Sequence, residues 1–173
     1  MNSNDLKHNI DCMKSQGNKI SLIIICCLLA FSCAKDALPF KTSNGSDTMG
    51  FIVNGDNWIA HSNDFKLSRT SAKYWTTYGL VVLGYKDSNS NMSFVLKNPK
   101  TGTYQFTTDD KVEYDLFSAP YKYSLDLSST TNTLNITRCD NSVVAGSFSF
   151  KLKSVAGEVV NITSGRFDIS VSQ

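Results

Sequence analysis

Short alternating runs of apolar and polar residues dominate the chain from Met49 onward. In residues 147–152, for example, two phenylalanines and a leucine alternate with two serines and a lysine. Successive side chains of a strand point to opposite faces, so a period of two predicts strands with one face in a core. Turn residues recur about every 8–12 residues, and no long apolar run has helical spacing. We expect an all-β fold over residues 49–173, a single antiparallel β-sandwich, with a β-barrel as the alternative.

Two local patterns make this expectation more specific. Asn54-Gly55 lies between apolar runs and predicts a tight hairpin, because both turn residues must accept a positive φ. The segment from Tyr74 to Tyr85 contains the apolar run Leu-Val-Val-Leu at residues 80–83. A continuous apolar run is typical of a strand covered on both faces, so we expect residues 74–85 to form one long, central, buried strand.

The N-terminal region has the pattern of an export signal. Lys14 and Lys19 precede an almost wholly apolar stretch over residues 20–33, which ends in small residues. The apolar run is about half of the roughly 20 residues that a membrane-spanning helix needs. We therefore expect residues 1–32 to be a signal peptide. Either Met1 or Met13 is the start, and a leader beginning at Met13 has ordinary proportions.

The end of this leader resembles a bacterial lipobox, which is the site where a cysteine thiol is lipid-modified. The residues are Leu-Leu-Ala-Phe-Ser-Cys at 28–33, with Ala30 where leucine is usual. The resemblance implies lipidation of Cys33 and a partner in the membrane, since two or more buried acyl chains give stable anchoring. The alternative is ordinary cleavage after Ser32, which would leave a secreted soluble protein.

Residues 33–48 are rich in Ser, Asn, Gly and Pro and predict a flexible tether. A lipidated Cys33 followed by a tether predicts that the domain lies in the cell envelope. We expect a lipid anchor in the outer membrane, with the domain facing either the periplasm or the cell surface.

Several motifs of the remaining chain resemble one bacterial family. They are Phe-x-Val-Asn-Gly-x-x-Trp at 51–58, Gly-Ser-Phe-Ser-Phe at 146–150 and Ile-Thr-x-Gly-Arg-Phe-Asp-Ile at 162–169. The pattern is similar to that of secreted Bacteroidota lipoproteins whose small β domains have unknown function. This resemblance implies a β-sandwich after a lipobox and carries no catalytic residues.

The search for catalytic and metal-binding residues is largely negative, so we predict no enzyme, no cofactor and no metal. His61 is the one histidine after residue 32 and is expected to be an exposed strand-end residue. Asp109-Asp110 fits a loop better than a glycosidase pair. Cys139 has no other cysteine to pair with once Cys33 is lipidated, and we expect a structural thiol. Residues 33–173 carry a net charge of +1 without a basic run, which argues against a nucleic-acid partner.

Aromatic residues in the first strands give the one indication of a ligand. Trp58, Tyr74, Trp75 and Tyr78 are possible ligand-binding residues, because exposed rings on a sheet stack on sugars. We expect a monomeric, non-enzymatic binding or scaffolding domain whose partner is a glycan or another envelope protein. The alternatives are a carbohydrate-binding module of a glycan-uptake system, which needs exposed coplanar rings, and a hydrolase, which needs His61 or a carboxylate pair in a pocket.

Overall fold

The structure is a computed structural model in which residues 37–61, 69–117 and 121–172 are described. These residues contain strands and no helix, which confirms the predicted all-β class. The predicted signal peptide and Cys33 lie outside the described residues. The strands are β1 Thr48–Val53, β2 Asp56–Ile59, β3 Thr70–Trp75, β4 Gly79–Lys86, β5 Ser90–Leu96, β6 Gly102–Thr103, β7 Lys111–Leu116, β8 Tyr121–Leu125, β9 Thr133–Cys139, β10 Val143–Ser154 and β11 Val159–Ser172.

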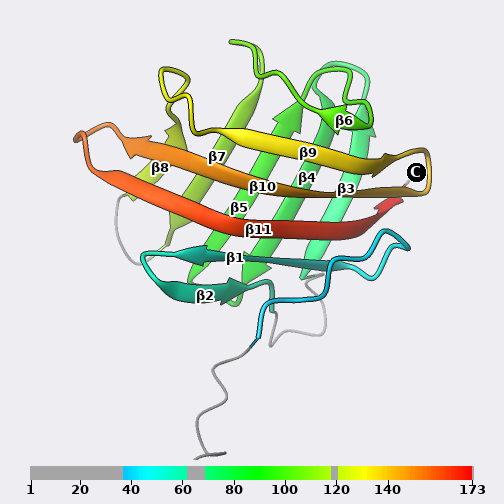
Figure 1. The fold of residues 1–173 in the computed structure, drawn as a ribbon, viewed down its shortest axis with the longest axis horizontal. Helices are drawn as coiled ribbons and strands as arrows, with labels where there is room; N and C mark the ends of the chain where they lie inside the picture. The colour runs from blue at the N-terminus through cyan, green and yellow to red at the C-terminus, as the bar shows by residue number, and fades with distance from the viewer. Residues whose placement is uncertain (1–36, 62–68, 118–120, 173) are drawn as a thin grey trace, which may run out of the picture. The chain divides into compact units, whose positions relative to one another are not determined.

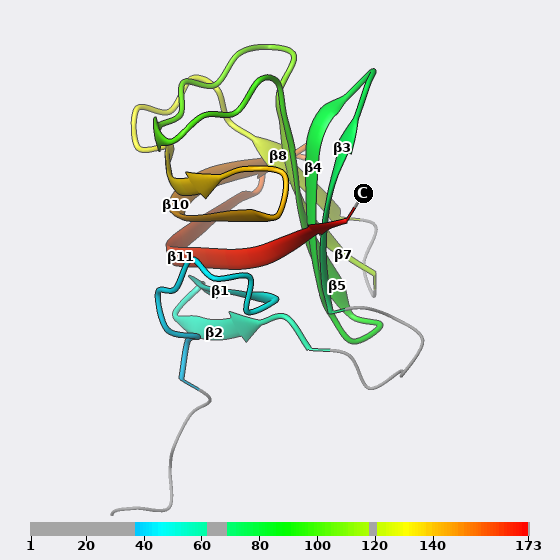
Figure 2. The same ribbon diagram turned by 90° about the vertical axis from the view of Figure 1, so that its right-hand side faces the viewer.

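The strands form one mixed sheet that folds into two layers, consistent with a β-sandwich. β1, β2, β9, β10 and β11 make the front layer of Figure 1, and β3, β4, β5, β7 and β8 cross behind them. Figure 2 shows the same two layers from the side. β10 joins the layers by pairing its end with β8, and the last residues of β11 pair in parallel with β3. Long strands that change layer in this way are typical of steeply crossed sheets.

Aromatic rings from both layers fill the space between them. Phe94 of β5 contacts Phe148 and Phe167 from the front layer, at centroid distances of 5.1 and 5.7 Å. All three rings are buried. The predicted alternation of residues 147–152 is confirmed, because Phe148, Phe150 and Leu152 point into the core. Burying such rings supplies much of the stabilisation of a small sandwich.

The predicted hairpin at Asn54-Gly55 is confirmed. Both residues have positive φ, 51° and 86°, and join β1 to β2 in antiparallel register. The single long strand expected over residues 74–85 is wrong. The chain turns at residues 76–78, and Gly79 has a φ of 85° that favours glycine. β4 is central as predicted, but its residues alternate between buried and half-buried, so only one face is fully covered.

The described part of the expected tether, residues 37–47, is not free chain. Its segment 38–47, which we call the strap, lies against β1 and β11. Thr42 Oγ1 and the amides of Asn44, Gly45 and Ser46 donate hydrogen bonds to the carboxylate of Asp168, at 2.6–3.2 Å. The expectation of a flexible segment fails here because Asp168 is 1% exposed and needs donors, which the strap supplies mostly from its backbone.

Candidate functional site

Three of the four aromatic residues singled out in the sequence lie exposed on the β3–β4 hairpin. The exposed fractions are 41% for Tyr74, 52% for Trp75 and 59% for Tyr78. Trp58 is different, because it is 2% exposed and its ring stacks on Phe51 at 4.5 Å. Its indole Nε1 donates a hydrogen bond to Ser90 Oγ at 2.8 Å. A buried indole of this kind is a core residue, so Trp58 is removed from the possible ligand-binding residues.

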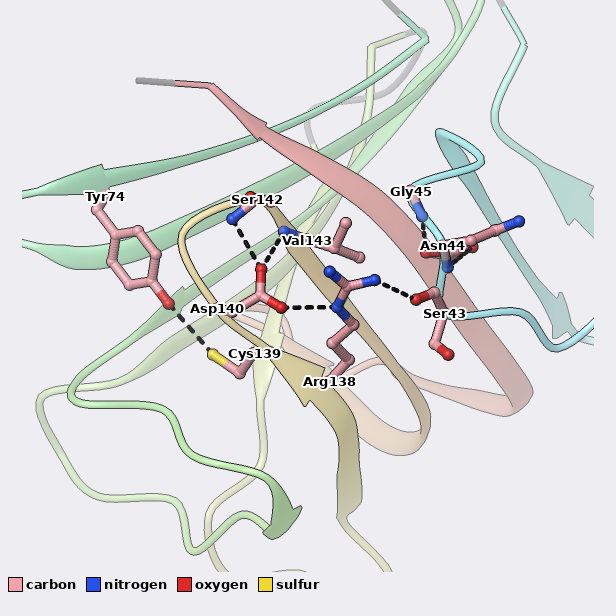
Figure 3. A network of polar contacts seen from close by, with 10 residues as sticks. Ser43, Asn44, Gly45, Tyr74, Arg138, Cys139, Asp140, Ser142 and Val143 are labelled. Carbon is pink, nitrogen blue, oxygen red and sulfur yellow. Dashed lines mark hydrogen bonds and ion pairs between the residues drawn. The ribbon is translucent and has the colours of Figure 1, made fainter.

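The rings of Tyr74 and Trp75 belong to opposite faces of β3, because successive residues of a strand alternate. Tyr74 reaches toward the β9–β10 hairpin, and a hydrogen bond of 3.2 Å joins its Oη to Cys139 Sγ (Figure 3). The Lys73 ammonium lies 5.6 Å from the centre of the Trp75 ring. Burial and then the hydrogen bond with Cys139 raise the pKa of Tyr74 above its ordinary value, so it stays a neutral phenol. A ligand that stacks on one face of β3 therefore meets either Tyr74 or Trp75, but not both.

Arg138 and Asp140 fix the hairpin that Tyr74 contacts. Arg138 Nε donates to Asp140 Oδ2 at 2.7 Å, and the amides of Ser142 and Val143 donate to Asp140 Oδ1 (Figure 3). The Arg138 hydrogen bond is the main cause that lowers the pKa of Asp140 to about 2. Arg138 Nη1 also donates to the Ser43 carbonyl of the strap, at 2.8 Å. The β3–β4 hairpin, which carries the exposed rings, thus borders a part of the domain that several side-chain hydrogen bonds hold in place.

His61 lies beside a hollow of about 560 Å³ that is also lined by Asn57, Ile59, Lys86 and Asp87. Its Nδ1 is 2.8 Å from Asp87 Oδ1, and its side chain is 58% exposed. The backbone of His61 forms an isolated parallel bridge with Lys86 at the end of β4. A carboxylate that orients an imidazole is one part of a general-base arrangement. Among the described residues lining this hollow, there is no Ser, Thr or Cys to act as a nucleophile.

The neighbouring carboxylates Asp109 and Asp110 differ in burial, since Asp109 is exposed and Asp110 is buried. Asp110 is 6% exposed and accepts hydrogen bonds from the Lys97 amide, Tyr104 Oη and both the amide and hydroxyl of Thr107. Burial alone would raise the pKa of Asp110, but these hydrogen bonds outweigh burial and lower it. Asp110 therefore holds the loop before β7, as expected for a structural residue.

A second hollow, which the sequence patterns did not predict, lies on the outer side of β9, β10 and β11. It measures about 300 Å³, and Lys41 of the strap and Arg166 of β11 line it together with hydroxyl side chains. Lys41 and Arg166 are 125 positions apart, and nothing in the local pattern links them. Recognising this site from sequence would have required knowing that the strap crosses β11.

The described ranges contain neither a cluster of metal-binding side chains nor a helix that could span a membrane. No group of three or more His, Cys, Asp or Glu side chains is arranged there to hold a metal ion. No helix of residues 37–61, 69–117 or 121–172 has the length and apolar character to cross a bilayer. The proposed lipidation site Cys33 is not among these residues.

Comparison with known proteins identifies a family for this chain. No curated protein and no solved structure matches the chain. A family model described as a domain of unknown function, DUF6252, matches residues 53–169, from the end of β1 into β11. This match covers most of the two-layered domain, including the β3–β4 hairpin and every residue that lines the outer hollow except Lys41 of the strap. The chain therefore belongs to the family of the domain of unknown function DUF6252.

Proposed function

We propose that this domain is a non-enzymatic binding module of a cell-envelope lipoprotein, and that the β3–β4 hairpin is its contact surface. The observation that supports this proposal is the exposure of Tyr74, Trp75 and Tyr78 within five consecutive residues. Large rings exposed together at the end of a hairpin often mark an interaction site. They offer a broad apolar contact with few rotatable bonds, so little conformational entropy is lost on binding.

A carbohydrate is the ligand class that suits these rings best, because sugar rings present apolar C–H faces to aromatic side chains. The affinity should depend chiefly on Trp75, whose large ring is half exposed. Affinity electrophoresis through gels containing a β-glucan, a mannan, a xylan or a pectin tests this class. We expect at least one polysaccharide to retard the protein, and Trp75→Ala to weaken that binding about tenfold, as the loss of ~1.4 kcal/mol would.

Phe117→Ala provides a matched control for the binding test. Phe117 is also 52% exposed and follows β7, away from the β3–β4 hairpin in the sequence. Its replacement should leave the retardation unchanged, while Tyr78→Ala should reduce it. Equal retardation of wild type, Trp75→Ala and Tyr78→Ala would contradict the hairpin as contact surface. Absence of retardation in every gel would contradict the carbohydrate ligand.

The lipoprotein part of the proposal rests on the sequence around Cys33. We propose that the mature protein begins at this cysteine, is anchored in the outer membrane by its acyl chains and acts as a monomer without a nucleic-acid partner. Fractionation of cells that produce the Cys33→Ala protein tests the anchor, with Cys139→Ala as the control. The Cys33→Ala protein should leave the membrane fraction and Cys139→Ala should stay in it; retention of both would contradict lipidation at Cys33.

His61 gives a specific reason to keep a hydrolase as the second candidate function. Its imidazole is oriented by Asp87 at the edge of a hollow. A hydrolase that uses His61 as general base should hydrolyse activated esters, and His61→Ala should lower that rate at least a hundredfold. Our proposal of a non-enzymatic module predicts the same low rate for wild type and His61→Ala.

A further inference from the structure

The outer hollow over β10 and β11 combines two cationic side chains with hydroxyl groups. It is lined by Lys41, Arg166, Thr133, Ser147, Ser149 and Ser164, and has a volume of about 300 Å³. Phe148 and Gly165 complete its lining. Both are buried residues, and the Phe148 ring points into the core on the other side of the layer.

The strap forms one wall of this hollow because Gly50 leaves room for it. Gly50 pairs with Arg166 across the β1–β11 ladder. A side-chain Cβ at position 50 would lie 2.6 Å from Pro39 Cδ, so Pro39 occupies the space that a larger residue would fill. The Pro39 carbonyl accepts a hydrogen bond of 2.7 Å from Arg166 Nη1. This contact holds the guanidinium against the strap and brings Lys41 to the same hollow.

A β-bulge in β11 shapes the opposite side. Phe148 pairs with Gly165 and Phe150 with Ile162, so two residues of β11 lie opposite Ser149. Ser164, at the bulge, has a φ of 54°. Bulges redirect side chains and occur often beside functional sites. Ser147 pairs with Arg166, and Ser149 pairs with Thr133 of β9, which sets the hydroxyl groups beside the guanidinium.

The charges of this hollow are not balanced by acidic side chains. No Asp or Glu lines it, and within the described residues neither Lys41 nor Arg166 forms an ion pair. Arg166 Nε lies below the surface without a hydrogen-bond acceptor in the described part of the chain. An orphaned guanidinium donor beside an ammonium and several hydroxyls is suited to an oxyanion with several oxygens. We propose that this hollow binds a phosphate group.

The phosphate could belong to a lipid headgroup or to a soluble molecule, and the strap favours the headgroup. Phe40 precedes Lys41 and is 88% exposed. An exposed ring next to a basic residue is the pairing that inserts at the interface of a bilayer with anionic lipids. Phosphate recognition itself does not depend on this source, nor on lipidation of Cys33.

Nuclear magnetic resonance of the ¹⁵N-labelled Cys33→Ala protein tests the site directly. In a titration with inorganic phosphate at constant ionic strength, we expect saturable shifts of the Arg166 Nε–H signal and of the amides of Ser147, Ser149 and Ser164. Lys41→Ala should weaken binding about fivefold, the effect of one basic side chain near an anionic phosphate. Lys41 is exposed and its replacement leaves the core intact.

Lys153→Ala is the matched control, because Lys153 is an exposed cation of β10 outside the hollow. It should bind phosphate as wild type does. Vesicles of phosphatidylglycerol distinguish the source: the same shifts, reduced by Phe40→Ser, indicate a headgroup, while shifts with inorganic phosphate alone indicate a soluble ligand. Shifts that do not saturate, or equal weakening by Lys41→Ala and Lys153→Ala, would overturn the proposal.

Discussion

Two buried carboxylates hold segments that have no regular secondary structure. Asp168 binds the strap and Asp110 binds the loop before β7, each through four donors. Burial alone would raise the pKa of Asp168, but the hydrogen bonds from Thr42 and three strap amides outweigh burial and hold it below the ordinary 3.8. The sequence could not reveal these roles, because most of the donors are backbone amides that any residue supplies.

Replacing the Asp168 carboxylate should loosen the strap and lower stability. In Asp168→Asn the side-chain NH₂ group faces other donors instead of accepting from them, so amides of the strap lose their acceptor. We expect the free energy of unfolding to fall by about 3 kcal/mol. Urea denaturation at pH 7 measures this, with Asp109→Asn as an exposed control that should change it by less than about 0.5 kcal/mol. Equal values for the two variants would show that the strap contributes nothing.

The same carboxylates predict how stability depends on pH. Their pKa values are lower in the folded state than in the unfolded state, so the folded form binds fewer protons in acid. The stabilisation is present above about pH 4 and is lost as the pH falls through the folded-state values. Urea midpoints at pH 7, 4 and 3 should decline, and the decline should be smaller in Asp168→Asn. A wild-type midpoint independent of pH would contradict this assignment.

At the scale of elements, the sequence predicts strands well and their ends less well. The first hairpin was predictable from Asn54-Gly55, because the tolerance of these two residues for positive φ depends on their own identity and not on distant parts of the fold. The break in residues 74–85 was missed, since Thr, Tyr and Trp favour strands and Gly79 alone marks the turn. Trp58 was among the possible ligand-binding residues, but it stacks on Phe51, its cross-strand partner in the β1–β2 hairpin. Exposure of a ring depends on the opposite layer, which the local pattern does not contain.

The contact between the strap and β1 can be tested at Gly50. A methyl group in Gly50→Ala would meet Pro39 Cδ, so the strap must shift and stability should fall by about 1–3 kcal/mol. Pro39→Ala removes the obstructing ring atoms. The double variant should therefore be more stable than the sum of the two single effects predicts. Additive urea-derived free energies would show that the two residues do not touch.

At the scale of the whole domain, the folded unit begins earlier than composition suggested. The Ser/Asn/Gly-rich composition before Met49 predicts a flexible tether. The strap, which is part of this segment, instead covers Asp168 and contacts Arg138 and Arg166. The two-layer architecture was predictable from alternation, because each strand buries one face. The joining of the layers by β10 and β11 was not predictable, since it depends on which ends of two long strands pair with β8 and β3.

Two truncated chains measure the contribution of the strap to the whole domain. A chain that starts at Ala37 keeps the donors to Asp168, whereas one that starts at Thr48 loses all of them. We expect the first to unfold at the same urea concentration as a chain starting at Ala34. The second should be less stable by at least the loss measured for Asp168→Asn. Identical stability of all three would restore the tether interpretation of residues 37–47.

The pairing of β1 with β11 has a consequence for the order of folding. β1 is the first strand of the described residues and its neighbour β11 is the last, with the other strands between them in the sequence. As the chain emerges from a ribosome, β1 can pair only with β2 until the 14 residues of β11 have been made. The pairing of β1 with β11 is therefore a contact between distant parts of the chain, and β1 lacks this neighbour until β11 is available.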